Sequence, residues 1–251
     1  MSAPLPIVSV DRVERVFPGG RRALAGVSLQ LARGELVGLV GPSGCGKSTL
    51  LRLIAGLDVP DAGKVDSPAT RSGGRAPVAF VFQDSTLMPW ASVFDNVWLP
   101  LRLAGLSRDA ASHSVTGILA RVGLADVIDA YPAELSGGMR MRVSIARALV
   151  TQPQLLLMDE PFAALDQLTR QRLNQDLLSW CAERDLGALF VTHSVAEAVF
   201  LCSRVLVMSA HPGRLLDEVS VDMSGPRDAR FRASPQFAAL CGRISETLEA
   251  A

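Results

Sequence analysis

Short apolar runs bounded by turn signals are the first pattern along this chain. They are rich in Val, Leu and Ile and are interrupted by Pro-Gly-Gly or Arg-Gly turns, which is typical of strands. Between them, apolar residues recur at helical spacing, as at Leu173, Leu177 and Trp180. We therefore expect strands at residues 8–17, 27–31, 36–40, 78–82, 155–158, 188–192 and 205–208.

Helices are expected in the intervals between these strands. One begins at Lys47, another follows Ser136, and residues 84–135 show an interrupted helical pattern that indicates an inserted subdomain. Strands that alternate with helices predict a mainly parallel sheet, and the strand-rich N-terminus predicts a smaller antiparallel sheet beside it. The expected fold class is therefore α/β. No element is predicted for the tail after Gly225.

Composition narrows the class of protein. The 251 residues are 49% hydrophobic, and 25 basic side chains balance 25 acidic ones, so we expect no nucleic-acid partner. No apolar run approaches the ~18 residues that span a bilayer, and no signal-peptide pattern opens the chain. We therefore expect a cytosolic protein. Scattered cysteines without a C-x-x-C pair predict neither a disulfide framework nor a zinc site.

A glycine-rich segment after the strand at 36–40 carries the strongest chemical signal. It fits the P-loop pattern G-x-x-x-x-G-K-[ST], whose backbone N–H groups cradle phosphate oxygens at the start of a helix. Only two of the 25 basic residues are lysine, and one of them, Lys47, falls in this pattern. We expect nucleoside triphosphate to bind through Gly41, Pro42, Ser43, Gly44, Cys45, Gly46, Lys47, Ser48 and Thr49.

Two further segments favour phosphate chemistry. The apolar strand at 155–158 ends in Asp159, which can hold a magnesium shell, and Glu160, which can deprotonate an attacking water. Ser136 is a natural helix N-cap, and Gly137 and Gly138 leave N–H groups uncovered there. The second helix start suggests another phosphate-facing surface.

Together these segments resemble the nucleotide-binding subunit of an ABC transporter. The motifs that carry the resemblance follow in this order: P-loop 41–49, Gln83, signature 135–139, Asp159-Glu160, 163–166 and His193. The resemblance covers about residues 8–213. It implies one ABC ATPase domain over 1–251, with a RecA-like P-loop NTPase core, an antiparallel β-subdomain and a helical subdomain at about 84–150.

The resemblance also implies a role for individual residues. Phe17 corresponds to the aromatic that stacks on adenine, and His193 to the histidine that holds the γ-phosphate. Asp166 corresponds to the residue that communicates across a dimer in which each ATP lies between one P-loop and the partner's Ser136, Gly137 and Gly138. Gln83 corresponds to the glutamine that contacts magnesium or the attacking water. Mg²⁺ is then the implied cofactor, with ATP as substrate, held by Ser48, Gln83 and Asp159.

One position departs from the family pattern. The signature usually ends in glutamine, whereas Met139 stands here and cannot donate that side-chain hydrogen bond. We still expect a working site, because Ser136 and the amides of Gly137 and Gly138 remain.

Segments 84–90, 93–97, 161–166, 197–199 and 211–214 resemble importers of nitrate, sulfonates and taurine. That resemblance implies a homodimer with two permease subunits at the cytoplasmic face of the inner membrane, served indirectly by a periplasmic or surface solute-binding protein. An exporter subunit is the main alternative. A soluble non-transport ABC ATPase is disfavoured by the absence of a long heptad run, and a small-molecule kinase by the signature and His193.

An apolar segment follows Gln83, where the family docks a permease helix. Its apolar members are Phe82, Leu87, Met88, Pro89, Trp90, Val93 and Phe94. Two interpretations stay open: the segment forms a partner-binding groove, or it fills the core of the helical subdomain.

Overall fold

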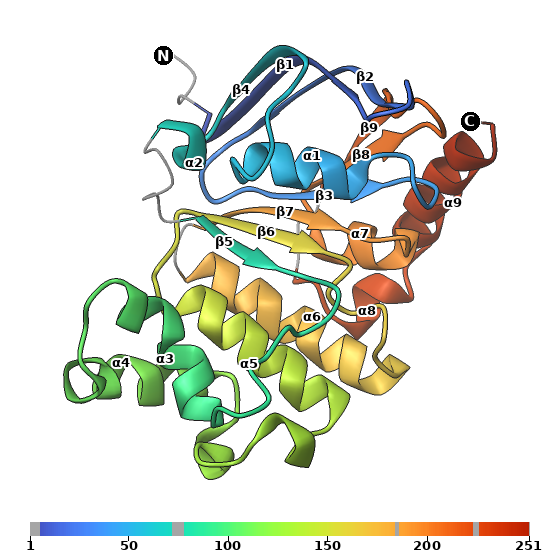
Figure 1. Cartoon of the computed structure of the whole chain (residues 1–251). Helices are drawn as coiled ribbons and strands as arrows, with labels where there is room; N and C mark the ends of the chain where they lie inside the picture. The colour runs from blue at the N-terminus through green and yellow to red at the C-terminus, as the bar shows by residue number, and fades with distance from the viewer. Residues whose placement is uncertain (1–5, 72–77, 184–185, 223–225, 251) are drawn as a thin grey trace, which may run out of the picture.

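The computed structural model describes residues 6–71, 78–183, 186–222 and 226–250. Its centre is a six-stranded sheet (Figure 1). In spatial order the strands are β5 (Val78–Val81), β6 (Leu155–Asp159), β7 (Gly187–Val191), β3 (Leu36–Val40), β8 (Arg204–Met208) and β9 (Leu215–Ser220). All pairings are parallel except that of β9 with β8. The predicted mainly parallel sheet is confirmed.

A second, antiparallel sheet of three strands lies above it, as the N-terminal pattern predicted. Its order is β2 (Arg22–Leu31), β1 (Val8–Val16) and β4 (Ala62–Asp66). Helix α1 (Lys47–Ile54) lies between the two sheets, and the short α2 (Pro68–Arg71) follows β4 (Figure 1).

The central sheet separates two hydrophobic cores because successive side chains on a strand point to opposite faces. Along β6, Leu155 and Leu157 pack in the core shared with α1 and the small sheet. Leu156 and Met158 pack in the core shared with the helices on the other face. The continuous apolar run that predicted this strand therefore reflects burial on both sides.

Helices cover that second face. They are α3 (Val93–Leu103), α4 (Arg108–Arg121), α5 (Gly137–Leu149) and α6 (Gln167–Ala182), with 3-10 turns at Ala125–Val127 and Pro132–Glu134. The interrupted helical pattern expected over 84–135 is explained in part by Gly105 and Gly123, which follow helix ends and have positive φ. None of the helices in the described ranges has both the length and the apolar character of a membrane span.

The C-terminal part contains one helix that was expected between the strands at 188–192 and 205–208, and two helices that the sequence pattern did not predict. Helix α7 (Val195–Leu201) follows β7, and α8 (Ala229–Arg232) and α9 (Pro235–Glu249) close the chain. Helix α9 packs beside α7 and β8, with Ile244 fully buried (Figure 1). The tail after residue 225 is therefore part of the folded unit.

Candidate functional site

The glycine-rich loop joins the end of β3 to the start of α1. Gly46 precedes the helix with φ 105°, and a Cβ there would lie 2.8 Å from the carbonyl oxygen of Ala23. Only glycine fits this conformation at such a close approach. No side chain among the described residues caps this helix end, so its first N–H groups are available to an anion.

Lys47 lies inside this loop. It is only 5% exposed, and its Nζ donates to the carbonyl oxygens of Gly41 at 2.8 Å and Pro42 at 2.9 Å. These contacts hold the ammonium group above the loop, where incoming phosphate oxygens can replace the carbonyls as acceptors.

A pocket of about 340 Å³ opens over the loop. It joins segments that are far apart in the sequence: the turn between β1 and β2 with the start of β2, the loop, the second residue after β5 and the residue after β6. Its lining residues are Phe17, Arg21, Ala23, Ser43, Gly44, Gly46, Lys47, Ser48, Thr49, Gln83 and Glu160. The structure therefore brings Phe17, Gln83 and Glu160 to one cavity with the P-loop.

Asp159 ends β6 next to the pocket. Burial raises the pKa of its carboxyl, opposed by a hydrogen bond from Ser48 and reinforced by the nearby charge of Glu160. A carboxyl and a hydroxyl in contact are oxygen ligands of the kind Mg²⁺ prefers. A divalent cation there would offset the cost of burying the Asp159 charge, so the residues present fit the implied metal.

Glu160 and His193 lie together, although the sequence analysis assigned them separate roles. His193 Nδ1 is 3.1 Å from Glu160 Oε2, and the Glu160 N–H donates to the carbonyl oxygen of Val191 at 2.9 Å. Glu160 has φ 47°, a conformation that non-glycine residues rarely adopt. The strand ends of β6 and β7 therefore present the carboxylate and the imidazole side by side.

The signature segment is built differently. Ser136 is exposed and accepts a hydrogen bond from the Met139 N–H at 3.3 Å, which caps α5. A Cβ on Gly138 would lie 2.5 Å from Cγ2 of Thr169, so any side chain there would have to displace Thr169 on α6. Met139 packs against the helical core. Residues 136–138 are not among those that line the pocket.

Asp166 is also outside the pocket. It caps α6 by accepting from the Thr169 N–H at 3.0 Å, and hydrogen bonds from Thr169 hold the pKa of its carboxyl below the usual value. Through Thr169 it lies near Gly138. The structure thus brings Asp166 to the signature, and not to the P-loop of the same copy.

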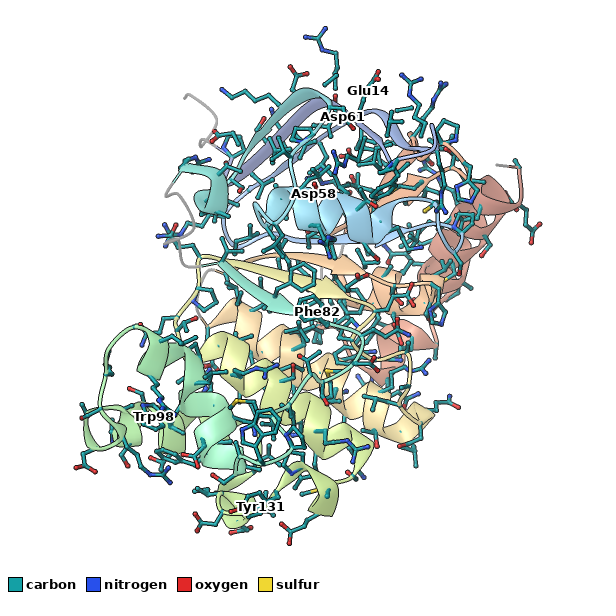
Figure 2. All side chains as sticks on the ribbon, in the orientation of Figure 1. Glu14, Asp58, Asp61, Phe82, Trp98 and Tyr131 are labelled. Atoms are coloured by element: carbon teal, nitrogen blue, oxygen red, sulfur yellow. The ribbon has the colours of Figure 1, made fainter. Side chains whose placement is uncertain are left out.

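Sequence reasoning missed Arg21 and Ala23 as pocket residues. No sequence pattern marks Arg21: it lies beside the predicted aromatic because the Phe17 N–H donates to the Arg21 carbonyl at 2.9 Å across the turn. Neighbouring arginines are held elsewhere. Arg15 pairs with Asp58 at 2.7 Å and Asp61 at 3.3 Å, and these acids lie at the end of the molecule formed by the small sheet (Figure 2).

Fold and pocket together define an α/β protein of the P-loop nucleoside-triphosphate-binding class. Residues 24–163 match the ABC transporter family, and the chain belongs to that family. It is therefore an ABC-type ATPase, which confirms the motif-based prediction of class and activity.

The chain is also similar to individual proteins of the ABC transporter family. The chain is 44% identical over 239 residues to the aliphatic sulfonates import ATP-binding protein SsuB 2 of Burkholderia cenocepacia, covering 95% of this chain and 86% of that protein. It is 40% identical to the nitrate import ATP-binding protein NrtD of Synechocystis sp., covering 96% and 94%. A dimeric ATP-binding cassette, MJ0796, solved in a post-hydrolysis state with ADP and Pi, superposes with TM-score 0.75 at 30% identity, covering 86% of this chain and 99% of that one.

Proposed function

We propose that this chain is the ATP-binding and ATP-hydrolysing subunit of an ABC importer that works through separate permease subunits. The observation that carries the proposal is the pocket, which gathers Lys47, Gln83 and Glu160 from three distant segments. The names of the relatives, which refer to sulfonate import and nitrate import, support import over export. The solute we infer is a small oxidised nitrogen or sulfur compound such as nitrate, taurine or an alkanesulfonate.

Nucleotide binding follows from the pocket lining. Phe17 stacks on adenine, while Lys47 and the loop N–H groups bind the phosphate oxygens. Ser48, Gln83 and Asp159 hold Mg²⁺, which supplies electrostatic stabilisation of the phosphate charge. The raised pKa of Asp159 is the physical support for this assignment, since a buried carboxylate favours a nearby cation.

Hydrolysis rests on the pair at the ends of β6 and β7. Glu160 lines the pocket and accepts the proton of the attacking water. His193 is held 3.1 Å from that carboxylate and binds the γ-phosphate beside it. The two side chains orient each other, which keeps the base and the phosphate ligand in a fixed geometry.

A second copy completes the site in this proposal. Ser136, Gly137 and Gly138 form a helix N-terminus outside the pocket, and Asp166 lies on the same side through Thr169. A head-to-tail dimer would bring this surface to the phosphates in the partner's pocket. We propose that residues 1–251 act as one ABC ATPase domain, in which residues of about 84–150 form the helical subdomain and the rest forms the RecA-like core and β-subdomain.

The permease is proposed to dock on the side of the helical subdomain. A groove of about 230 Å³ runs between β5 and helices α3 and α5, and Phe80, Leu99, Pro100 and Leu103 contribute apolar atoms to it. Leu103 is 80% exposed. Such an exposed apolar surface suits a partner helix.

Some residues of the segment after Gln83 fit the core of the helical subdomain, and others fit a partner-binding surface. Val93 and Phe94 are buried in the core of the helices, whereas Trp90 is 77% exposed and Phe82 is 39% exposed. The exposure of Trp90 supports a docking role for that residue. We propose that the chain works as a homodimer bound to two permease subunits at the cytoplasmic face of the inner membrane, served indirectly by a periplasmic or surface solute-binding protein.

Docking is tested with Trp90→Asp. The variant should remain folded and hydrolyse ATP, but should no longer co-purify with its permease. Val59→Asp is the matched control, because Val59 is 72% exposed on the loop before β4, far from the helical subdomain. Loss of folding in Trp90→Asp alone would assign Trp90 to the core, and retained co-purification would remove it from the docking surface.

The solute is tested in a deletion strain without a redundant transporter. Growth on nitrate as sole nitrogen source, or on taurine or an alkanesulfonate as sole sulfur source, should fail. The wild-type gene should restore it, and Lys47→Ala should not. Normal growth of the deletion strain on all three compounds would contradict the solute class while leaving the ATPase assignment intact.

A further inference from the structure

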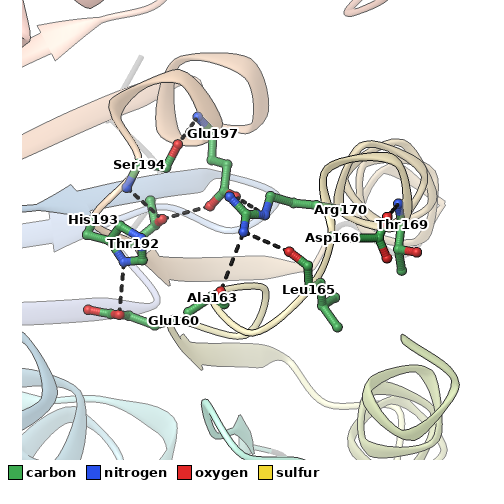
Figure 3. A network of polar contacts seen from close by, with 10 residues as sticks. All are labelled: Glu160, Ala163, Leu165, Asp166, Thr169, Arg170, Thr192, His193, Ser194 and Glu197. Carbon is green, nitrogen blue, oxygen red and sulfur yellow. Dashed lines mark hydrogen bonds and ion pairs between the residues drawn. The ribbon is translucent and has the colours of Figure 1, made fainter. Parts of the chain in front are cut away.

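The residues on either side of His193 are anchored. The Thr192 hydroxyl donates to Glu197 Oε2 at 2.7 Å and accepts the Ser194 N–H at 3.0 Å (Figure 3). Thr192 is 2% exposed and Glu197 is 7% exposed. The loop that carries His193 is therefore held by a buried carboxylate on the first turn of α7.

The same carboxylate reaches a second loop through Arg170 on α6. Arg170 Nε lies 3.2 Å from Glu197 Oε1. Its Nη2 donates to the carbonyl oxygens of Leu165 at 2.9 Å and Ala163 at 3.4 Å (Figure 3). These two carbonyls belong to the loop that connects Glu160 to Asp166.

Together these contacts form a closed ring that includes Glu160. The Ala163 N–H donates to the Glu160 carbonyl oxygen at 3.2 Å, and Glu160 Oε2 lies 3.1 Å from His193. From Glu160 the ring runs through the 163–166 loop, Arg170, Glu197 and Thr192 to His193, and back to Glu160 (Figure 3). A displacement of the 163–166 loop is therefore transmitted to the histidine through hydrogen bonds and the Arg170–Glu197 ion pair.

A buried ion pair is a poor means of stabilising a fold, because desolvation offsets much of the attraction, and an apolar pair of similar volume does as well. What the pair provides is a connection: one guanidinium donates hydrogen bonds to two carbonyls and forms an ion pair with a carboxylate. Here those groups belong to the two loops that carry Asp166 and His193.

We propose that Arg170 and Glu197 are positioning residues that couple the loop bearing Asp166 to His193, so that the partner copy at Asp166 controls whether His193 and Glu160 are aligned. The proposal rests on the proposed function. Neither side chain lines the nucleotide pocket, so each acts through its neighbours.

Three variants cut the ring at different points: Arg170→Met, Glu197→Gln and Thr192→Val. Each should lower kcat about tenfold or more, leave the Kd for ATP within about twofold, and bring the Hill coefficient for ATP close to one. Arg204→Met is the matched control. Arg204 is a similarly half-buried arginine that bridges Glu35 at 2.9 Å and the Gln30 carbonyl at 2.6 Å, away from the site.

A second readout does not depend on turnover. The chain has three histidines, so the ring resonances of His193 can be assigned by NMR, with His113 and His211 as internal references. In Thr192→Val, which removes one hydroxyl and keeps the side-chain shape, the His193 resonances should shift or broaden while the references stay unchanged.

Outcomes separate this inference from the proposed function. If all three variants match Arg204→Met in kcat and Hill coefficient, or if the His193 resonances do not change in Thr192→Val, the positioning role is wrong. If the wild-type chain itself hydrolyses no ATP, the proposed function fails, while the NMR comparison still decides whether the ring holds His193.

Discussion

The P-loop and the signature segment are both helix N-termini opened by glycines, but their surroundings differ. At α1, Gly46 and Lys47 are buried, and residues from several other segments, including Phe17 and Glu160, form walls over the loop. At α5, Ser136 and Gly137 are exposed, and the contacts made by Gly138 are with α6. The P-loop therefore lies in a pocket, whereas the signature segment lies on an exposed surface.

This difference separates two tasks. An enclosed cavity with a lysine, a hydroxyl and carboxylates can bind a nucleotide within one copy. An exposed helix start contributes N–H groups and a partial positive charge, which are useful only when another surface supplies the rest of the ligand's contacts. Variants in the first region should therefore affect single copies, and variants in the second should affect only the dimer.

The largest effect is expected at Glu160. Glu160→Gln should keep ATP binding but lower turnover by ~10²-fold or more, the usual scale for losing a general base. Phosphate release by the purified variant measures it, with wild-type chain as reference and the Kd of a fluorescent ATP analogue as control. Turnover close to wild type would remove Glu160 from this role.

A comparably clear loss is expected at Lys47. Lys47→Ala removes the ammonium group that lies against the loop carbonyls, so affinity for ATP should fall by roughly tenfold or more, and turnover with it. Lys64→Ala controls for the loss of a lysine, since Lys64 is exposed on β4. Equal analogue binding by both variants would contradict the placement of Lys47.

The second region is tested with Ser136→Arg. The variant should bind ATP as a single copy with wild-type affinity, because residue 136 lies outside the pocket. In the Glu160→Gln background, which traps ATP, it should abolish the ATP-dependent dimer that sedimentation detects without it. A dimer that persists in Ser136→Arg, or no ATP-dependent dimer in the parent even with the permease present, would refute the shared site.

A smaller effect is expected at Arg21, and it tests whether this residue belongs to the nucleotide pocket. Arg21→Ala should raise the Kd for ATP about threefold to tenfold, because its side chain lines the cavity and charge-assisted contacts contribute modestly at partly exposed sites. Arg22→Ala is the control, since Arg22 pairs with Glu14 at 2.5 Å instead. Equal affinities for the two variants would exclude Arg21 from nucleotide recognition.

The smallest effect is on stability. Because the pKa of Asp159 is raised by burial, the folded chain binds its proton more tightly than the unfolded chain, so this group favours folding at low pH and opposes it as pH rises through the folded pKa. At neutral pH without nucleotide, Asp159→Asn should raise Tm by roughly 1–3 °C. Calorimetry should also show that Mg²⁺-ATP stabilises the wild type more than the variant. A lowered Tm would contradict the unfavourable burial.

The sequence predicted the elements that are buried on two faces and missed those held by pairing alone. Strand β4 carries Ala62, Gly63 and Lys64, all exposed, and forms by pairing with β1 rather than through an apolar pattern of its own. Helix α9 was missed although it does carry a pattern: Phe237, Leu240, Cys241, Ile244 and Leu248 recur at helical spacing and pack on the core, yet no helix was predicted there. A strand such as β4 can therefore be identified only when its pairing partner in space is known.

The site was predicted where chemistry requires fixed spacing. The P-loop has its pattern because phosphate binding needs glycines and a lysine in one short turn. Arg170 and Glu197 carry no such signal, because they meet only after α6 and α7 pack, and many sequences contain an arginine and a glutamate 27 positions apart. Arg21 likewise enters the pocket through a turn, so its proximity to Phe17 depends on strand pairing.

The burial of Lys47 has a practical consequence for labelling. The chain contains two lysines, and the other, Lys64, is exposed on β4. Amine-reactive dyes should therefore attach to Lys64 and to an α-amino group, while Lys47, at 5% exposure, stays unmodified. A fluorophore on the small sheet can then be introduced in one step, without mutagenesis and without blocking the nucleotide pocket, and can serve as an acceptor for energy transfer from a labelled permease.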